Sequence, residues 1–248
     1  MEKDQKKIVN FRGAHIPQFE AEVLQELEIL VGKQYRLVNK VEYTTVGFSV
    51  ENNRITGLSL YYCGVSTLPE SIGNLKSLQI FDLKLNKLST LPESFGNLSS
   101  LEVVHLYENT LSTLPESIGN LSSLKKLDLR ENQLESLPES IGNLSSLTGL
   151  NLHKNKLSTL PKSIGNLKSL SFLSLEFNNI KSLPESIGNL TSLTMLSIKN
   201  NNLKTLPETI ARLSLLEKLW VSNNQLDSRA KSMLIQLRKK GVDVIGRF

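Results

Sequence analysis

Apolar residues along most of the chain follow one repeated pattern. The order L-x-x-L-x-L-x-x-N-x-L begins at Ile55 and begins again at Leu78, an interval of 23 residues (78 − 55). The same interval, with no insertion or deletion, separates the later copies, which begin at Leu101, Leu124, Leu147, Leu170, Leu193 and Leu216. In most copies the segment x-x-L-P-E-S-I-G-N-L-x-S follows. A fixed period of this length indicates a repeat architecture in which neighbouring units bury a shared core.

Each unit begins with a pattern typical of a short β-strand. The last two leucines of L-x-x-L-x-L alternate with other residues, so one face of the segment is apolar. Strands of successive units should pair in parallel about 4.8 Å apart, and their inward side chains then stack in columns. One column contains Leu58, Phe81, Val104, Leu127, Leu150, Leu173, Leu196 and Leu219. The pattern therefore predicts an α/β coil with a parallel sheet along one face.

The segment L-P-E-S-I-G-N-L, which returns to the next strand, predicts short turns on the opposite face. Its proline fixes the local backbone and its glycine is free to adopt positive φ, so 3₁₀ or extended structure fits there and a long α-helix does not. The glutamates of these segments should form a solvated, mildly repulsive ridge, broken by Lys162, rather than a metal site. They are Glu70, Glu93, Glu116, Glu139, Glu185 and Glu208.

Asparagine recurs where each strand gives way to the turn. These residues are Asn86, Asn109, Asn132, Asn155, Asn178, Asn201 and Asn224, with Cys63 at the same place in the first copy. A buried backbone group without a partner costs about 1–3 kcal/mol, and an asparagine amide has both donors and an acceptor for the turns on either side. We interpret this column as a structural ladder. Cys63 is then a small substitute rather than a reactive thiol, because buried structural cysteines are usually inert.

The flanking segments are predicted to cap the coil, which gives one continuous domain in three parts: residues 1–54, 55–226 and 227–248. Pro17 suits a first helical turn, and an amphipathic helix should run from Gln18 to Val31 and stop at Gly32. Its apolar stripe contains Phe19, Val23, Leu24, Leu27, Leu30 and Val31. The alternation over residues 46–50 predicts a strand, and residues 51–54 a hairpin turn. The alternative is that the helix docks a partner.

The C-terminal segment predicts a second cap. A helix should run from Ser228 to Lys240 before Gly241, with a last strand over residues 242–245. The inward residues of the helix are Ala230, Met233, Leu234 and Leu237. Residues 227–248 carry six cations and two carboxylates (6 − 2 = +4), most of the whole-chain charge of +5. These cations either complement the helix dipole or attract nucleic acid or an anionic surface, and we favour the dipole.

Composition narrows the class of protein. Cys63 is the single cysteine, which excludes an intrachain disulfide and a zinc site built on several cysteines. Residues 1–7 lack the apolar core of a signal peptide, and no apolar run is long enough to span a bilayer. We expect a cytoplasmic monomer without cofactor or metal. Four N-x-S/T sequons, at Asn97, Asn120, Asn143 and Asn189, either mark glycosylation or follow from the repeat itself, and we favour the repeat.

The units resemble the leucine-rich repeat family, in particular the 23-residue intracellular class of plant Ras-group-related proteins, Ras-binding scaffold proteins and Roco GTPases. Residues 46–63, which lead into the first repeat, are similar to those of some prokaryotic members. The resemblance implies a right-handed horseshoe whose concave sheet binds proteins, without catalysis, and a small GTPase or other signalling protein as partner. No G-x-x-x-x-G-K-[ST] loop occurs, so a Roco-type GTPase domain is absent from the sequence.

Function should lie where this uniform repeat varies, at the outward strand positions. Two apolar clusters occur there: the first has Tyr61, Tyr62, Ile80, Leu85, Val103 and Tyr107, and the second has Phe172, Phe177, Met195 and Trp220. Exposed apolar patches usually mark binding surfaces, whereas the alternative is that aromatic and β-branched residues simply suit a strand. The predicted protein-binding residues are Tyr61, Tyr62, Leu85, His105, Tyr107, Arg130, His153, Phe172, Phe177, Met195 and Trp220.

The charged residues at the outward positions and the histidines of the chain disfavour two other functions. Nucleic-acid binding there is disfavoured because six cations face five carboxylates (6 − 5 = +1), a poor track for phosphates. These charged residues are Lys84, Lys126, Arg130, Lys154, Lys199 and Lys218 against Asp82, Glu108, Asp128, Glu131 and Glu176. Catalysis is disfavoured because His15, His105 and His153 are scattered and no nucleophile with an orienting base is visible. Gly57 and Ser59 complete the outward positions of the first strand.

Overall fold

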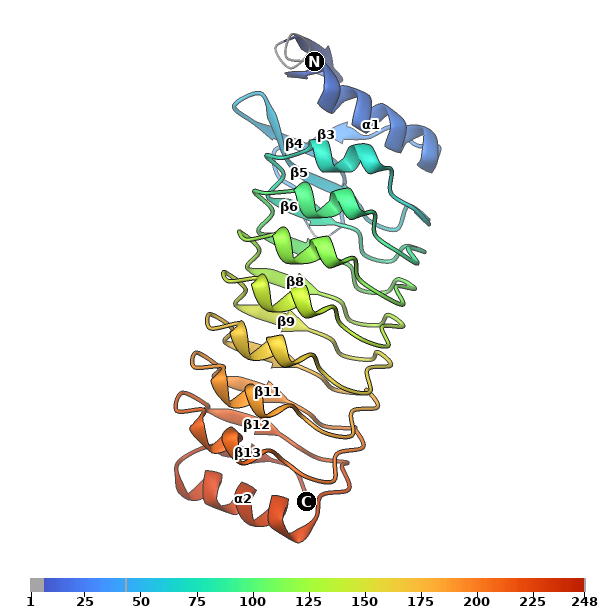
Figure 1. The fold of residues 1–248 in the computed structure, drawn as a ribbon. Helices are drawn as coiled ribbons and strands as arrows, with labels where there is room; N and C mark the ends of the chain where they lie inside the picture. Colours follow the sequence, from blue (N-terminus) through green and yellow to red (C-terminus); the bar gives the residue numbers. More distant parts are fainter. Residues whose placement is uncertain (1–6, 43, 248) are drawn as a thin grey trace.

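The computed structural model describes residues 7–42 and 44–247, so the first six residues of the expected N-terminal cap, Tyr43 and Phe248 lie outside it. An 11-stranded sheet runs along the molecule in the order β13-β12-β11-β10-β9-β8-β7-β6-β5-β4-β3. The chain coils steadily from one end of this sheet to the other, with α1 over the first turn and α2 over the last (Figure 1). This architecture confirms the predicted α/β solenoid.

The repeat strands are short and in register. The first, β5, covers Arg54–Leu60, and each later repeat contributes three residues. These strands are β6 Ile80–Asp82, β7 Val103–His105, β8 Lys126–Asp128, β9 Gly149–Asn151, β10 Phe172–Ser174, β11 Met195–Ser197 and β12 Lys218–Trp220. All neighbours from β5 to β12 pair in parallel, with Phe81 opposite Leu58 and Val104 opposite Phe81. The predicted column of inward side chains is therefore confirmed, and every member of it is buried.

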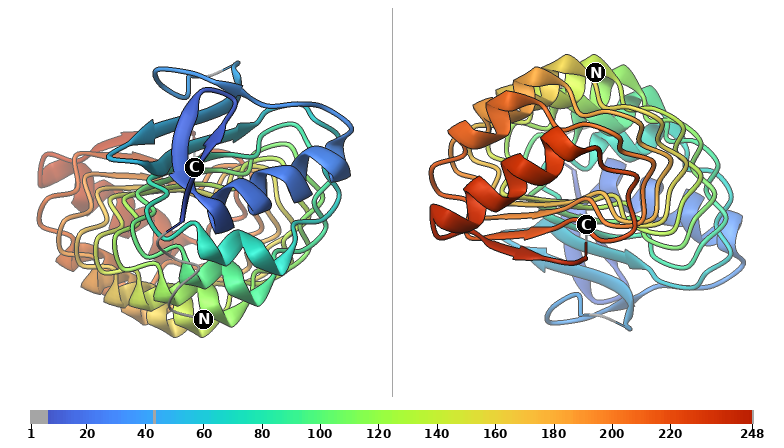
Figure 2. Two further views of the ribbon diagram at one scale, coloured as in Figure 1. Left: turned by 90° about the horizontal axis from the view of Figure 1, so that it is seen from above. Right: turned by 90° about the horizontal axis from the view of Figure 1, so that it is seen from below.

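Five-residue 3₁₀ helices line the opposite face, as Figure 2 shows along the axis of the coil. They are η2 Glu70–Asn74, η3 Glu93–Asn97, η4 Glu116–Asn120, η5 Glu139–Asn143, η6 Lys162–Asn166, η7 Glu185–Asn189 and η8 Glu208–Arg212. The predicted 3₁₀ structure is confirmed, but the expected role of glycine is wrong. The glycines of these 3₁₀ helices do not have positive φ. A Cβ at Gly119 would instead overlap the Ser140 carbonyl oxygen and lie 2.7 Å from Ser140 Cβ, so glycine is needed for close packing between turns.

The asparagine side chains bridge successive turns through their amides. Asn109 Nδ2 donates to the carbonyl oxygens of Leu83 and Leu106, at 2.9 and 3.0 Å. Its Oδ1 accepts the N–H of Leu88 at 3.0 Å. In the first repeat the Cys63 N–H donates to Asn86 Oδ1 at 3.1 Å. Cys63 is half-buried, and burial raises the pKa of its thiol, which disfavours the reactive thiolate.

The N-terminal cap contains the predicted helix and hairpin. Helix α1 covers Gln18–Val31 and ends at Gly32, where φ is 68°. Strand β4, Val46–Glu51, pairs antiparallel with β5. Val23, Leu24 and Leu27 are buried, but Leu30 is 52% exposed because the first 3₁₀ turn packs against only part of the helix. The expected inward position of Leu30 is therefore wrong.

Three further strands complete this cap and were not predicted. β1, Ile8–Phe11, and β2, Ala14–Pro17, form a separate antiparallel hairpin. β3, Arg36–Leu37, pairs in parallel with β4 at the end of the large sheet. Pro17 closes β2 and precedes α1, rather than lying in the first helical turn.

A buried carboxylate joins the cap to the first repeat. Glu20 on α1 accepts the Ile55 N–H at 2.9 Å and Arg54 Nε at 2.5 Å. Burial raises the pKa of this carboxyl despite these two donors. These two bonds to Glu20 fix α1 against the first repeat strand.

The C-terminal cap is a helix followed by a strand, as predicted. Helix α2 covers Ser228–Lys239, and the Asp227 side chain caps it by accepting the Ala230 N–H at 2.7 Å. Strand β13, Asp243–Ile245, extends the sheet beyond β12. Arg238 donates from Nε and Nη2 to the Val244 carbonyl oxygen at 3.2 and 2.7 Å, which occupies an acceptor on the edge strand.

Candidate protein-binding face

The concave face consists of four positions in each repeat. They are the two outward residues of the strand, the next residue in the same alternation and the residue directly after it, for example Gly57, Ser59, Tyr61 and Tyr62. The N-terminal end of this face is covered. Gly57 and Ser59 are buried, and so are Asp82 and Lys84 in the next repeat. The expectation that these four outward positions meet water is therefore wrong.

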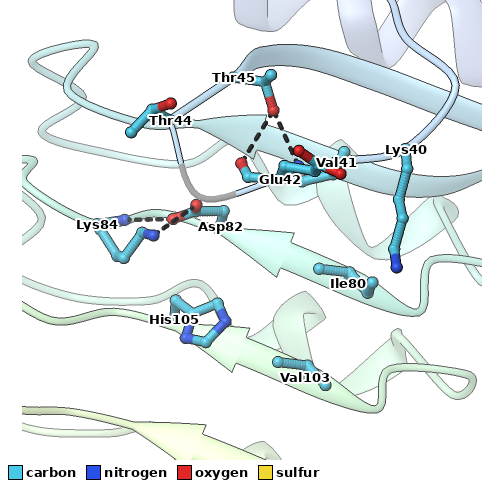
Figure 3. A pocket seen from close by; sticks show the side chains of 10 residues that line it. All are labelled: Lys40, Val41, Glu42, Thr44, Thr45, Ile80, Asp82, Lys84, Val103 and His105. Carbon is cyan, nitrogen blue, oxygen red and sulfur yellow. Dashed lines mark hydrogen bonds and ion pairs between the residues drawn. The ribbon is translucent and has the colours of Figure 1, made fainter.

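The cover is a segment of the N-terminal cap. Val41 lies so close over β5 that a Cβ at Gly57 would be 2.9 Å from Val41 Cγ2. This segment and the first concave strands line an open cavity of about 530 Å³. In Figure 3, Val41 and Thr45 lie above Asp82 and Lys84, while Ile80, Val103 and His105 line the other side. The cap thus buries part of the surface that the repeats alone would expose.

A carboxylate, a cation and an aromatic ring form one connected group beside this cavity. Lys84 Nζ lies 3.1 Å from Asp82 Oδ2 and 5.5 Å from the ring centroid of Tyr61. The Lys84 N–H also donates to Asp82 Oδ1 at 3.1 Å. The ion pair is neutral overall and fixes the cation beside the ring.

The same group recurs two repeats later. Arg130 Nε and Nη2 donate to the two Asp128 carboxylate oxygens at 2.8 and 2.6 Å, and the guanidinium carbon lies 4.8 Å from the ring centroid of Tyr107. The bond to Asp128 raises the pKa of Arg130. His105 Nδ1 lies 4.0 Å from Asp128 Oδ2, and burial lowers the pKa of that imidazole.

The C-terminal half uses different partners. His153 Nδ1 lies 3.4 Å from Glu176 Oε2, and the His153 ring meets the Phe177 ring edge-on at 5.1 Å. Lys199 Nζ lies 3.0 Å from the same carboxylate, and Ser197 Oγ donates to it at 2.7 Å. Burial by itself would raise the pKa of Glu176. The hydrogen bonds from Ser197 and Lys199 outweigh burial, so the pKa lies below its ordinary value.

The two apolar clusters are assembled to different degrees. In the first, Ile80 and Val103 are register partners, and the Tyr61 and Tyr62 rings are 6.4 Å apart. The second is divided. Phe172 and Met195 are register partners, but Phe177 packs on His153. Trp220 lies opposite Ser197.

A backbone feature at the rim of this face was missed by the sequence reasoning. The residue before each asparagine of the ladder, and before Cys63 at the same place in the first repeat, has the left-handed backbone conformation. Its φ is 52° at Tyr62, 53° at Leu85 and 54° at Phe177. This conformation costs residues other than glycine about 1–2 kcal/mol, least for asparagine. The last two repeats place Asn200 and Asn223 there, each directly before an asparagine of the ladder. These two consecutive asparagines are the signal in the sequence that could have revealed the left-handed position. Large apolar residues thus occupy a position that disfavours them, and Tyr62 and Phe177 remain 71% and 45% exposed.

The convex glutamates bind the backbone of the next turn. The side chains of Glu70, Glu93 and Glu139 accept the N–H groups of Ser94, Ser117 and Ser163 at 3.2, 3.3 and 3.0 Å. The bonds from Ser163 lower the pKa of Glu139. The ridge is therefore more than solvated charge, since it links successive 3₁₀ helices. Among residues 7–42 and 44–247, no three His, Cys, Asp or Glu side chains gather as a metal site would require.

The comparisons with known proteins agree with this architecture. A model described as leucine-rich repeat region matches residues 54–128, 96–178 and 140–239, which together span most of the chain. The chain belongs to the leucine-rich repeat proteins. Proteins of this family generally act as protein-interaction modules and not as catalysts. No helix within the described residues has the length and apolarity required to cross a membrane.

Two solved leucine-rich repeat structures are similar. One is a leucine-rich repeat protein of Leptospira interrogans, with 35% identity over 77% of this chain and 55% of that chain, and a TM-score of 0.64. The other is the ectodomain of the membrane receptor kinase GASSHO1/SCHENGEN3 of Arabidopsis thaliana, in complex with CASPARIAN STRIP INTEGRITY FACTOR 2. It is 28% identical over 82% of this chain and 25% of that chain, with a TM-score of 0.71. This chain therefore spans about half of the first relative and a quarter of the second. A comparison with curated proteins gave no match.

Proposed function

We propose that this chain is a non-catalytic scaffold that binds a protein partner on its concave face. The supporting observation is the rim: Tyr62 and Phe177 are large, apolar and exposed at a backbone position that disfavours them. Folding alone gains little from such residues, so binding is the better account of their presence.

The geometry of the face supports the proposal further. Tyr107 is held against Arg130, and Arg130 is held by Asp128, so the ring is ordered before any partner arrives. Ordered aromatic side chains lose little conformational entropy on binding and are enriched at interface hot spots. The predicted binding residues remain a prediction until a partner is tested.

The resemblance to the 23-residue intracellular class suggests a partner class and a setting. We propose a small GTPase or another signalling protein as partner, and a monomeric scaffold in the cytoplasm. The similarity to the Leptospira protein agrees with a prokaryotic origin, and the single cysteine with a reducing compartment.

Affinity capture from cytosol of the source organism tests the proposal. We compare the wild-type chain with a variant that carries Tyr107→Ala, Phe177→Ala and Trp220→Ala. The matched control is Ile29→Ala on α1, which truncates an apolar side chain that is 82% exposed away from the concave face. Each concave substitution should cost about 2 kcal/mol of binding energy. A partner retained equally by the triple variant contradicts the proposal, and so does a hydrolase activity that His105→Ala removes.

The alternative is binding of nucleic acid or an anionic surface through the basic C-terminal cap. Two of its cations already have internal partners, since Arg229 pairs with Glu208 and Arg238 binds the Val244 carbonyl oxygen. The ion pair offsets one positive charge, and the bond to the carbonyl oxygen occupies guanidinium donors that could otherwise bind phosphate. Binding of a DNA duplex or an anionic vesicle that weakens steeply with salt would favour this alternative over the concave face.

A further inference from the structure

One column of the concave face alternates flat rings with cations. Successive repeats place Tyr61, Lys84, Tyr107, Arg130 and His153 at the same position, each 23 residues after the last (84 − 61). Rings therefore occur in every second repeat. We call Tyr61, Tyr107 and His153 the ring column.

Each ring of this column is held by a neighbour that is itself fixed. Lys84 lies beside the Tyr61 ring and is bound to Asp82, and Arg130 lies beside the Tyr107 ring and is bound to Asp128. His153 contacts the Glu176 carboxylate and meets the Phe177 ring in a T-shaped arrangement. The rings are half-buried, so each is anchored and still reaches solvent.

The spacing of the rings selects among ligand conformations. Neighbouring strands lie about 4.8 Å apart, so rings in every second repeat recur at about 9.6 Å. A polyproline II helix returns to the same side every third residue, after about 9.3 Å. Two turns of an α-helix rise about 10.8 Å, and a β-strand returns to the same side after about 6.7 Å, so over three rings both fit less well than polyproline II. Seven residues of polyproline II would span all three rings.

The charges and donors of the column match the same ligand. Both cations between the rings have a carboxylate partner, so the surface does not call for a charged segment. A polyproline II backbone has no internal hydrogen bonds, and its carbonyl oxygens need donors. The hydroxyls of Tyr61 and Tyr107 are such donors, and Arg130 commits Nε and Nη2 to Asp128 but not Nη1.

We propose that the ring column binds an uncharged proline-rich segment of a partner in the polyproline II conformation. The segment lies across the strands and places every third residue on Tyr61, Tyr107 and His153. This inference rests on the proposed function and specifies the kind of partner sequence that the concave face recognises.

The test uses the full chain and a decaproline peptide blocked at both ends, with a glycine–serine peptide of equal length as its control. Calorimetry should detect the decaproline and not the control, with little dependence on salt. Tyr107→Ala and Tyr61→Ala should each weaken binding about tenfold. Tyr107→Phe should retain most of it, because the ring remains. Ile29→Ala should bind as the wild-type chain does.

If Tyr107→Ala fails to fold, Tyr107→Leu serves in its place, because leucine keeps apolar bulk without a flat face. Absence of decaproline binding by the folded wild-type chain overturns the inference, and so does binding that survives both tyrosine truncations. Neither result touches the proposed function, which is decided separately by partner capture with the triple variant.

Discussion

The convex and concave faces of this solenoid come from the same repeats, yet they tolerate different amounts of sequence change. On the convex face each 3₁₀ helix packs so closely on the next that a Cβ at Gly119 would overlap Ser140. On the part of the concave face that the cap does not cover, the nearest neighbouring atom to a Cβ at Gly149 is 4.0 Å away. Close backbone packing therefore fixes the convex sequence, whereas the concave side chains project from strands already paired through their backbones.

The last convex turn supports this explanation. Six 3₁₀ helices, η2 to η7, carry glycine at this position, but η8 carries Ala211. Helix α2, rather than another 3₁₀ helix, follows η8. Once no further turn packs against the position, a methyl group is accepted.

The largest expected effect tests this contrast with one pair of substitutions. Gly119→Ala should lower the free energy of unfolding by about 3 kcal/mol, because the new methyl group must displace the Ser140 backbone. Gly149→Ala, with ordinary contact distances, should change it by less than about 0.5 kcal/mol. Urea unfolding measures both. Equal losses would show that close packing does not distinguish the faces.

The asparagine ladder lies between the two faces and should show the next largest effect. Asn132→Ala removes the acceptor for the Leu111 N–H and the donors to the Leu106 and Leu129 carbonyl oxygens, all buried. We expect a loss of about 2–3 kcal/mol in the free energy of unfolding. Asn224→Ala at the half-buried last rung should cost less, because water can replace its bonds. A greater loss at Asn224 would contradict this account of the ladder.

The rim of the concave face should show a smaller effect of opposite sign. Tyr62→Asn places a residue that favours the left-handed conformation at φ 52° and removes a ring that is 71% exposed. We expect a gain of about 0.5 kcal/mol in thermal or urea stability. Asn200→Tyr is the reciprocal control and should lose a similar amount. Destabilisation by Tyr62→Asn would mean that the ring contributes to folding, which weakens the case for binding.

The smallest effect concerns pH at the concave face. Burial lowers the pKa of His105 below its ordinary value of 6.5, so below that pH the unfolded chain binds more protons than the folded chain. This group therefore reduces stability as the pH falls through about 6.5 towards its lower folded pKa. His105→Gln should make stability less sensitive to pH between 7.5 and 5.5, as followed by urea unfolding at each pH. An unchanged pH dependence would contradict the assigned cause.

The period and the apolar pattern predicted most of the fold. Leu127 and Leu150 could be assigned to one inward column because every unit has the same length, so the register follows from counting. Asn132 could be assigned to a buried turn because it follows the strand at a fixed place. The candidate face could be assigned for the same reason, as the alternate positions of each strand.

What the sequence alone could not predict depends on contacts across long separations. Val41 covers Gly57, and Glu20 binds Ile55, because the cap folds back on the first repeats. No periodicity relates a unique cap to the repeats. The exposure of the first concave positions was therefore predicted wrongly, and the division of the second apolar cluster was missed.

The sequence by itself determined that this chain is a coil of equal turns, because a constant period permits only one way for every unit to bury its leucines. The tertiary structure alone decided which variable side chains reach solvent and which rings are held by cations. Those properties depend on where the cap lies and on the distance between neighbouring turns, and both are set by packing between segments far apart in the chain.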